Sequence, residues 1–179
     1  VGKALNVDLV LEPNLQRLGE RIRVNVRLIR VADGFVIWTD TINESSSDLL
    51  GVQDKIAARI LNSVPFELSG EERLLLGKRS TNSSDAYEYY LYGRQNALKG
   101  TKEGIRSAIA SYEKAISADP TYALAYAAMA DAYRTLAFPG FARSKEVCPQ
   151  ARELANKALE LDPTLAEGYT ILGYIDFLY

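Results

Sequence analysis

Apolar and polar positions alternate with a period of about two residues between residues 8 and 43. Such alternation is typical of half-buried strands, because successive side chains of a strand point to opposite faces of a sheet. The phase slips where Leu28 and Ile29 become adjacent, so we expect a strand end or a bulge there. The apolar face of the middle strand is expected to consist of Ile22, Val24, Val26 and Leu28.

Glycines divide this region into strands. Gly19 and the Asp33-Gly34 pair are typical of tight hairpin turns, because they supply the positive φ that such turns need. The pattern predicts three antiparallel strands, at about residues 7–17, 20–31 and 35–43. Pro13 cannot donate a ladder hydrogen bond, so the first strand is expected to lie at the sheet edge or to bulge there.

After the sheet the apolar period lengthens to three and four residues, which predicts a helix packed on the sheet. Ser47 is the expected N-cap and Pro65 the expected end. A second, short helix is predicted at "SGEERLLLGK", residues 69–78, from its capping-box spacing. We place the boundary between two domains, 1–80 and 81–179, in the polar stretch 80–85. The stripe of the first helix is Leu49, Val52, Ile56 and Ile60.

Residues 1–80 resemble the carboxy-terminal part of the TolB-like amino-terminal domain of bacterial signalling proteins. The resemblance rests on "LNVDLVLEPNLQRLGERIRVNVRLIRVADGFVIWTDTI", followed by "LLGVQDKIAARI". It implies a regulatory segment joined to a protein kinase, a nucleotide cyclase or a winged-helix DNA-binding domain. Family members usually carry a further strand and helices before this point. The matching residues are Val10, Leu11, Glu12, Gly19, Arg23, Val24, Gly34, Trp38, Gln53 and Asp54.

Two similar segments, "EKAISADP" at 113–120 and "NKALELDP" at 156–163, reveal an internal repeat in the second half. Pro120 and Pro163 lie 43 positions apart, nine more than the 34 residues of a tetratricopeptide repeat. The stretch "AFPGFARSKEVCPQ", residues 137–150, is expected to form a loop that holds this excess.

Residues 85–179 resemble tetratricopeptide repeats, in which small residues let two helices approach and bulky ones fill the gaps between them. Two repeats and the first helix of a third are expected, and an ordinary helical bundle is the alternative. The first repeat carries Tyr89, Tyr92, Gly93, Ala108, Tyr112, Ala115 and Pro120. The second carries Tyr126, Met129, Ala130, Tyr133, Ala151, Ala155, Ala158 and Pro163, and the third begins with Tyr169, Leu172 and Gly173.

Composition narrows the chemistry. The chain has no histidine, which excludes Ser-His and Cys-His nucleophiles and zinc sites built from histidine. Its single cysteine, Cys148, is interpreted as a small loop or partly buried thiol. No phosphate-binding loop, nucleophile elbow or metal-ligand spacing occurs, so we expect no enzyme activity and neither a cofactor nor a metal.

Charge gives no indication of a nucleic-acid partner. Basic and acidic residues number 11 and 11 in residues 1–80, and 10 and 12 in residues 81–179. The arginines of the middle strand are read as a solvated sheet face, where Glu12, Glu20 and Asp40 can pair with them. No stretch of the sequence is long and apolar enough to span a membrane, so we expect a cytoplasmic location, or a periplasmic one if the full-length protein has a span.

The resemblance to tetratricopeptide repeats implies a concave groove for a protein or peptide. The expected groove lacks the Lys and Asn array that clamps the terminal carboxylate of a peptide. We therefore expect it to bind an extended or helical protein segment, with Arg94 or Arg134 contacting an acidic group. The predicted lining is Tyr87, Tyr90, Arg94, Ala97, Leu124, Ala127, Asp131, Arg134, Glu167, Thr170 and Tyr174.

The last helix lacks a polar outer face, so a homodimer or a domain swap is predicted. Its contact residues would be Tyr169, Leu172, Ile175 and Leu178.

The sequence therefore predicts an α+β chain: a small antiparallel sheet with a packed helix, followed by an all-α solenoid of helical hairpins. Its expected function is a non-catalytic interaction or scaffold module of a larger bacterial signalling protein. The alternative is a small-ligand sensor with a pocket between the sheet and the repeats around Trp38, controlling a fused kinase, cyclase or DNA-binding domain.

Overall fold

A computed structural model describes residues 4–45, 49–63, 69–70, 79–137 and 141–178 of the 179-residue chain. The chain divides into two compact units, Val1–Lys78 and Arg79–Tyr179. The first contains strands and one described helix and is called the sheet unit below. The described elements of the second are all helices, and it is called the helical unit.

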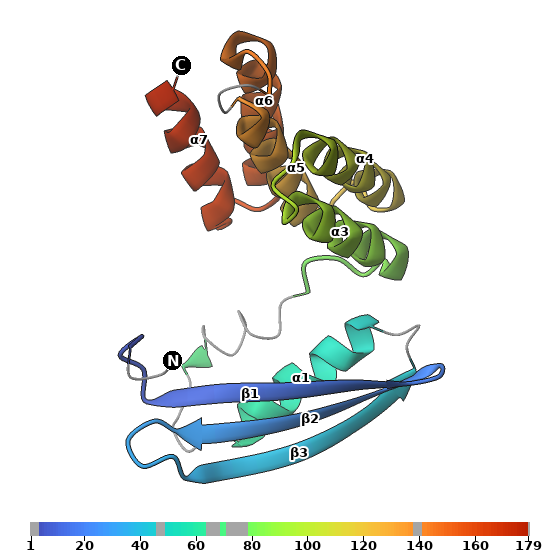
Figure 1. The fold of residues 1–179 in the computed structure, drawn as a ribbon, viewed down its shortest axis with the longest axis vertical. Coiled ribbons are helices and arrows are strands. Elements are labelled where there is room, and N and C mark those ends of the chain that lie inside the picture. Colours follow the sequence, from blue (N-terminus) through green and yellow to red (C-terminus); the bar gives the residue numbers. More distant parts are fainter. Residues whose placement is uncertain (1–3, 46–48, 64–68, 71–78, 138–140, 179) are drawn as a thin grey trace. The chain divides into compact units, whose positions relative to one another are not determined.

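The sheet unit is built on three antiparallel strands in the order β1, β2, β3 (Figure 1), namely Leu9–Leu18, Arg21–Arg30 and Val36–Ser45. β1 lies at an edge, which confirms the expectation from Pro13. The pairing of β2 with β3 shifts between Leu28 and Ile29, as the slip in alternation predicts.

One helix covers one face of this sheet (Figure 1). It is α1, Leu49–Ser63, and it contacts β3. Leu11 and Leu15 of β1 lie opposite Leu28 and Val24, yet they remain 37% and 62% exposed, so the apolar core of the sheet unit is small and one-sided. The buried cluster consists of Ile22, Val24, Val26, Ile42 and Val52, with Trp38 and Ile56 packed against it.

Several predictions for this unit fall on residues beyond the described ranges. These are the Ser47 cap, Pro65, the side chains of Leu49 and Ile60, and residues 71–78 of the second short helix. Leu50, which the predicted stripe of α1 omits, is buried.

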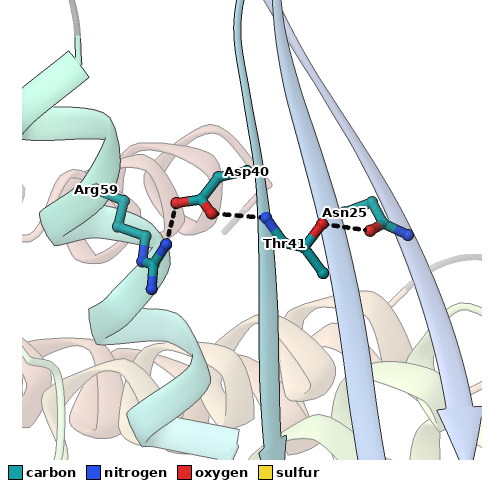
Figure 2. Close-up of polar contacts among 4 residues, drawn as sticks. All are labelled: Asn25, Asp40, Thr41 and Arg59. Atoms are coloured by element: carbon teal, nitrogen blue, oxygen red, sulfur yellow. Dashed lines mark hydrogen bonds and ion pairs between the residues drawn. The ribbon is translucent and has the colours of Figure 1, made fainter.

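Asp40 lies on the opposite face of the sheet from the one predicted. It stands beside Val26 in the ladder, so it shares the apolar face with that residue and forms an ion pair with Arg59 of α1 (Figure 2). The hydrogen bond from Arg59 lowers the pKa of the Asp40 carboxyl. Glu44 faces the same way and pairs with Lys55, so two ion pairs one helical turn apart hold α1 on β3.

On the polar face of the sheet, the predicted pairing with arginine forms at Glu12, whereas Glu20 does not lie on a strand. Arg27 of β2 forms an ion pair with Glu12 of β1. Glu20 lies in the turn that joins these strands. The Thr41 hydroxyl donates to Asn25 Oδ1 at 2.9 Å across the ladder (Figure 2), so this face is cross-linked by polar side chains.

The helical unit contains five described helices, joined by short connections (Figure 1). Each helix packs on the next one in the chain, and α5 also contacts both α3 and α7. The helices α3, α5 and α7 therefore form one row, with α4 and α6 behind it. Their bounds are Ser84–Ala97 for α3, Lys102–Ala118 for α4, Ala123–Leu136 for α5, Ser144–Leu161 for α6 and Ala166–Leu178 for α7.

Small residues occupy the helix crossings, as the repeat pattern predicts. Ala108, Ala130 and Ala151 are each 0% exposed. A methyl group added at Gly93 would lie 2.3 Å from Cε1 of Tyr112, so only glycine permits this approach of α4 to α3.

Tyr89 and Tyr92 were expected to fill the gap between α3 and α4, and this prediction was wrong. They are 37% and 51% exposed. On this side of α3 it is Gly93 that faces α4, and the Tyr112 ring packs against it.

The same hydrogen-bonded turn precedes both α5 and α7. Asp119 Oδ1 accepts from the amide and hydroxyl of Thr121 at 2.9 and 2.6 Å, and Asp162 Oδ1 accepts from those of Thr164 at 3.1 and 2.7 Å. Ser83 caps α3 by accepting from the amide of Ala86. The repeat seen in the sequence is thus a repeat of local structure.

The predicted loop 137–150 is mostly wrong. Helix α6 begins at Ser144, and Val147 and Cys148 are buried within it. Their spacing extends the apolar stripe that continues through Ala151, and the helix includes Pro149. Cys148 is therefore a fully buried helix residue.

Candidate functional site

A groove of about 710 Å³ runs over the row of helices α3, α5 and α7. Its lining is mostly apolar, and each of the three helices adds one charged side chain. The residues predicted to line it that do so are Tyr90, Arg94, Ala97, Leu124, Ala127, Asp131, Glu167 and Thr170.

The three other predicted residues, Tyr87, Arg134 and Tyr174, do not line this groove. Tyr87 packs, partly buried, against the core of the helical unit. The Arg134 guanidinium lies 4.5 Å from the centre of the Tyr174 ring, so these two residues bind each other.

The floor of the groove is more buried than predicted. Tyr90 and Ala127 are only 7% and 1% exposed. The Tyr90 ring packs against those of Tyr112 and Tyr122, with centroids 6.0 and 5.3 Å away. Burial raises the pKa of the Tyr90 hydroxyl, and the charge of Arg94 opposes this rise. These tyrosines are thus neutral, apolar packing groups that end in hydroxyls.

Three charged side chains line the groove, and one of them, Asp131, forms an ion pair with Arg134. Arg94 stands on α3 and Glu167 on α7, and both are exposed. Asp131 of α5 accepts from Arg134 at 2.7 Å. The groove therefore presents a cation and an anion on opposite helices of the row, with a neutralised pair between them.

The sequence pattern missed several lining residues, among them Ile105 and Tyr112 of α4. The prediction took positions only from the first helix of each repeat. Gly93 was the available signal, because a glycine at a helix crossing indicates that the next helix approaches closely enough to reach the groove. Ile171 of α7 was missed because it was not expected to turn toward α5.

The predicted dimer surface on α7 requires correction. Ile175 is 0% exposed, because it shares a helix face with Ile171 that packs on α5 and α6. Tyr169 is exposed, Leu172 is partly buried, and the side chain of Leu178 lies beyond the described residues. Among the side chains of α7 that the structure describes, the most exposed apolar one is instead Phe177 at 85%.

The alternative site around Trp38 is part of the sheet core. Trp38 packs, partly buried, against the cluster that contains Val24 and Val26.

Within the ranges that the structure describes, no cluster of three or more His, Cys, Asp or Glu side chains is arranged to hold a metal ion. In those same ranges no helix combines the length and the apolar character needed to cross a membrane.

Two kinds of curated protein are similar to this chain, and no protein-family profile matches it. The chain is 25% identical over 178 residues to "Putative adenylate cyclase 3" of Rhizobium meliloti, covering 97% of this chain and 30% of that protein. It is 24% identical over 159 residues to the transcriptional regulator HilA of Salmonella typhimurium, covering 87% of this chain and 28% of that protein. The chain thus spans less than a third of each relative.

Proposed function

We propose that this chain is a non-catalytic regulatory module of a larger bacterial signalling protein. Its helical unit acts as a tetratricopeptide-like scaffold that binds a segment of another protein in the groove. The observation that carries this proposal is the groove itself, because three helices repeat along it and each contributes both packing and charged side chains.

The two relatives support a regulatory role over a catalytic one. One is named for a cyclase and the other for a transcriptional regulator, yet each is similar to most of this chain. A single stretch of sequence cannot supply two such different outputs. The shared part is better explained as a module that controls different outputs, since function resides in sites and not in folds.

The shape and composition of the groove support a peptide as its occupant. Its volume of about 710 Å³ falls in the range of small-molecule pockets, roughly 300 to 1,000 Å³. However, the groove lies across three consecutive hairpin positions and has exposed charges on its outer helices. An extended or helical segment can contact all three helices of such a surface with successive side chains along its length.

The test is a selection of random 12-residue peptides on the intact 179-residue chain. Thr170→Trp fills the groove from an exposed position of α7, whereas Tyr169→Trp places the same ring at the neighbouring exposed position, which does not line the groove. Selected peptides are expected to bind the wild type and Tyr169→Trp equally and Thr170→Trp at least about tenfold more weakly, a difference of about 1.4 kcal/mol.

Failure to enrich any peptide would contradict the proposal, and so would peptides whose affinity Thr170→Trp leaves unchanged. A thermal-shift response to a nucleotide or metabolite that Thr170→Trp abolishes would favour the small-ligand sensor instead.

A further inference from the structure

The groove holds one cation that no carboxylate of the described residues pairs with. This is Arg94, an exposed residue of α3 that lines the groove. It lines the groove together with Tyr90, one helical turn before it on α3, and the two side chains share a hydrogen bond. A guanidinium has five N–H donors, so Arg94 keeps several of them for an incoming anion, which is the acceptor that stabilises it most.

The other arginine of this surface, Arg134, is already engaged. Its Nε donates to Asp131 at 2.7 Å, its guanidinium stacks on Tyr174, and the side chain is only 17% exposed. A ligand would have to break both contacts to recruit it. Of the two arginines predicted to meet an acidic group, the structure leaves Arg94 available.

The carboxylates in the groove limit how much negative charge the occupant can carry. Glu167 of α7 and Asp131 of α5 both line it. A run of acidic residues would be repelled by Glu167, whereas a single acidic side chain placed over α3 would meet Arg94 alone. The apolar lining between these helices, including Leu124 and Ala128, suits neighbouring apolar side chains of the same segment.

We infer that the groove recognises a predominantly apolar protein segment with one acidic side chain, and that Arg94 binds this carboxylate. This inference rests on the proposed peptide-binding function and adds the chemistry of the partner. Arg94 fixes the register of the segment, because a bidentate pair forms at one position only, while the apolar side chains supply contact area.

The experiment uses the 12-residue peptide selection on the intact chain. The strongest peptide is made in two forms, with its acidic residue and with the matching amide, Asp to Asn or Glu to Gln. Both are titrated against the wild type, Arg94→Gln and Arg106→Gln. Arg106 is an exposed arginine of α4 that does not line the groove, so it controls for the loss of one positive charge.

We expect enriched peptides to share an acidic residue at one position. Arg94→Gln is expected to weaken the binding of the acidic peptide about tenfold and to leave the affinity for the amide peptide nearly unchanged. Arg106→Gln is expected to change the affinity for either peptide by no more than about twofold. Arg94→Glu is expected to select a basic residue at that position instead.

Peptides that bind in the groove, as judged by Thr170→Trp, but tolerate the change from acid to amide would overturn this inference and leave the peptide-binding function standing. Equal losses in Arg94→Gln and Arg106→Gln would also overturn it, because they indicate a general charge effect. If no peptide is enriched, the proposed function fails and this inference fails with it.

Discussion

The two units of this chain hold their helices in place through different kinds of contact. In the sheet unit, α1 rests on a small apolar cluster and is held by two ion pairs, Lys55 with Glu44 and Arg59 with Asp40. In the helical unit, contacts are made by residues too small to keep the helices apart, such as Gly93 and Ala130. Shape is therefore the sensitive variable in the helical unit, and charge matters more in the sheet unit.

The chain carries a separate optical reporter for each unit. Its only tryptophan, Trp38, lies in the sheet cluster, and all eleven tyrosines lie beyond residue 86. Tryptophan fluorescence thus follows the sheet unit, while tyrosine fluorescence and helical circular dichroism follow chiefly the helical unit. Urea titrations read at both signals can assign each change to its unit.

The largest effect is expected from Ala130→Leu, which forces a large side chain into a crossing where the alanine is 0% exposed. Overpacking of this kind costs about 1 to 3 kcal/mol, and we expect the upper end because α5 contacts α6 closely along its length. The tyrosine signal should shift to lower urea while the Trp38 signal stays. Ala110→Leu, on an exposed face of α4, is the control and should change neither signal.

A smaller loss is expected from Gly93→Ala, about 1 to 2 kcal/mol, because the new methyl group lies 2.3 Å from a ring atom of the buried Tyr112. The matched position in α7 is Gly173, which has nothing within 4 Å of an added methyl. Gly173→Ala should instead stabilise the helix by roughly 0.5 to 1 kcal/mol. Equal effects of the two variants would refute the close approach of α4 to α3.

Acid should weaken the sheet unit through Asp40. The hydrogen bond from Arg59 lowers the pKa of this carboxyl in the folded state, so its stabilising effect is complete above the unfolded value of about 4. It is lost as the pH falls through the lower folded value. Asp40→Asn should reduce stability at pH 7 by less than Gly93→Ala does, and should flatten the acid decline of the Trp38 signal below about pH 4. An unchanged acid profile would contradict this role.

The smallest effect is expected from Tyr122→Phe, with the opposite sign. The Tyr122 side chain is 0% exposed, and its hydroxyl has no hydrogen-bond partner among the described residues. Removing a buried, unsatisfied hydroxyl should leave the helical unit unchanged or stabilise it by roughly 0.5 kcal/mol. A loss of about 1 kcal/mol in the tyrosine-monitored urea titration would show that the hydroxyl is bonded in solution.

Local patterns predicted much of this fold because they are set by neighbours in the chain. Alternation placed the three strands to within a few residues, and the adjacent Leu28 and Ile29 marked the shift in pairing. Gly19 and Gly34 were recognised as hairpin turns, and both have a positive φ. Each of these features depends on a few consecutive side chains.

The errors arose where distant residues decide the outcome. The face on which Asp40 lies depends on the pairing of β3 with β2, and no property of the residue itself reveals it. The burial of Tyr90 and Ile175 depends on which helix packs against them. The groove was found in outline because helical steps place its residues on one side of α3, α5 and α7. The contribution of Ile105 and Tyr112 was missed, because it depends on the close approach of α4 to α3 at Gly93.

The paired turns at Asp119 and Asp162 have a practical consequence. Since each begins a new helix with the same local bonds, the stretch between them is a self-contained building block with matching ends. Splicing an extra copy of residues 119–161 in front of Asp162 would join identical ends to one another. The helical unit could in this way be lengthened by one pair of helices, and the connections at both ends of the insert would keep their present form.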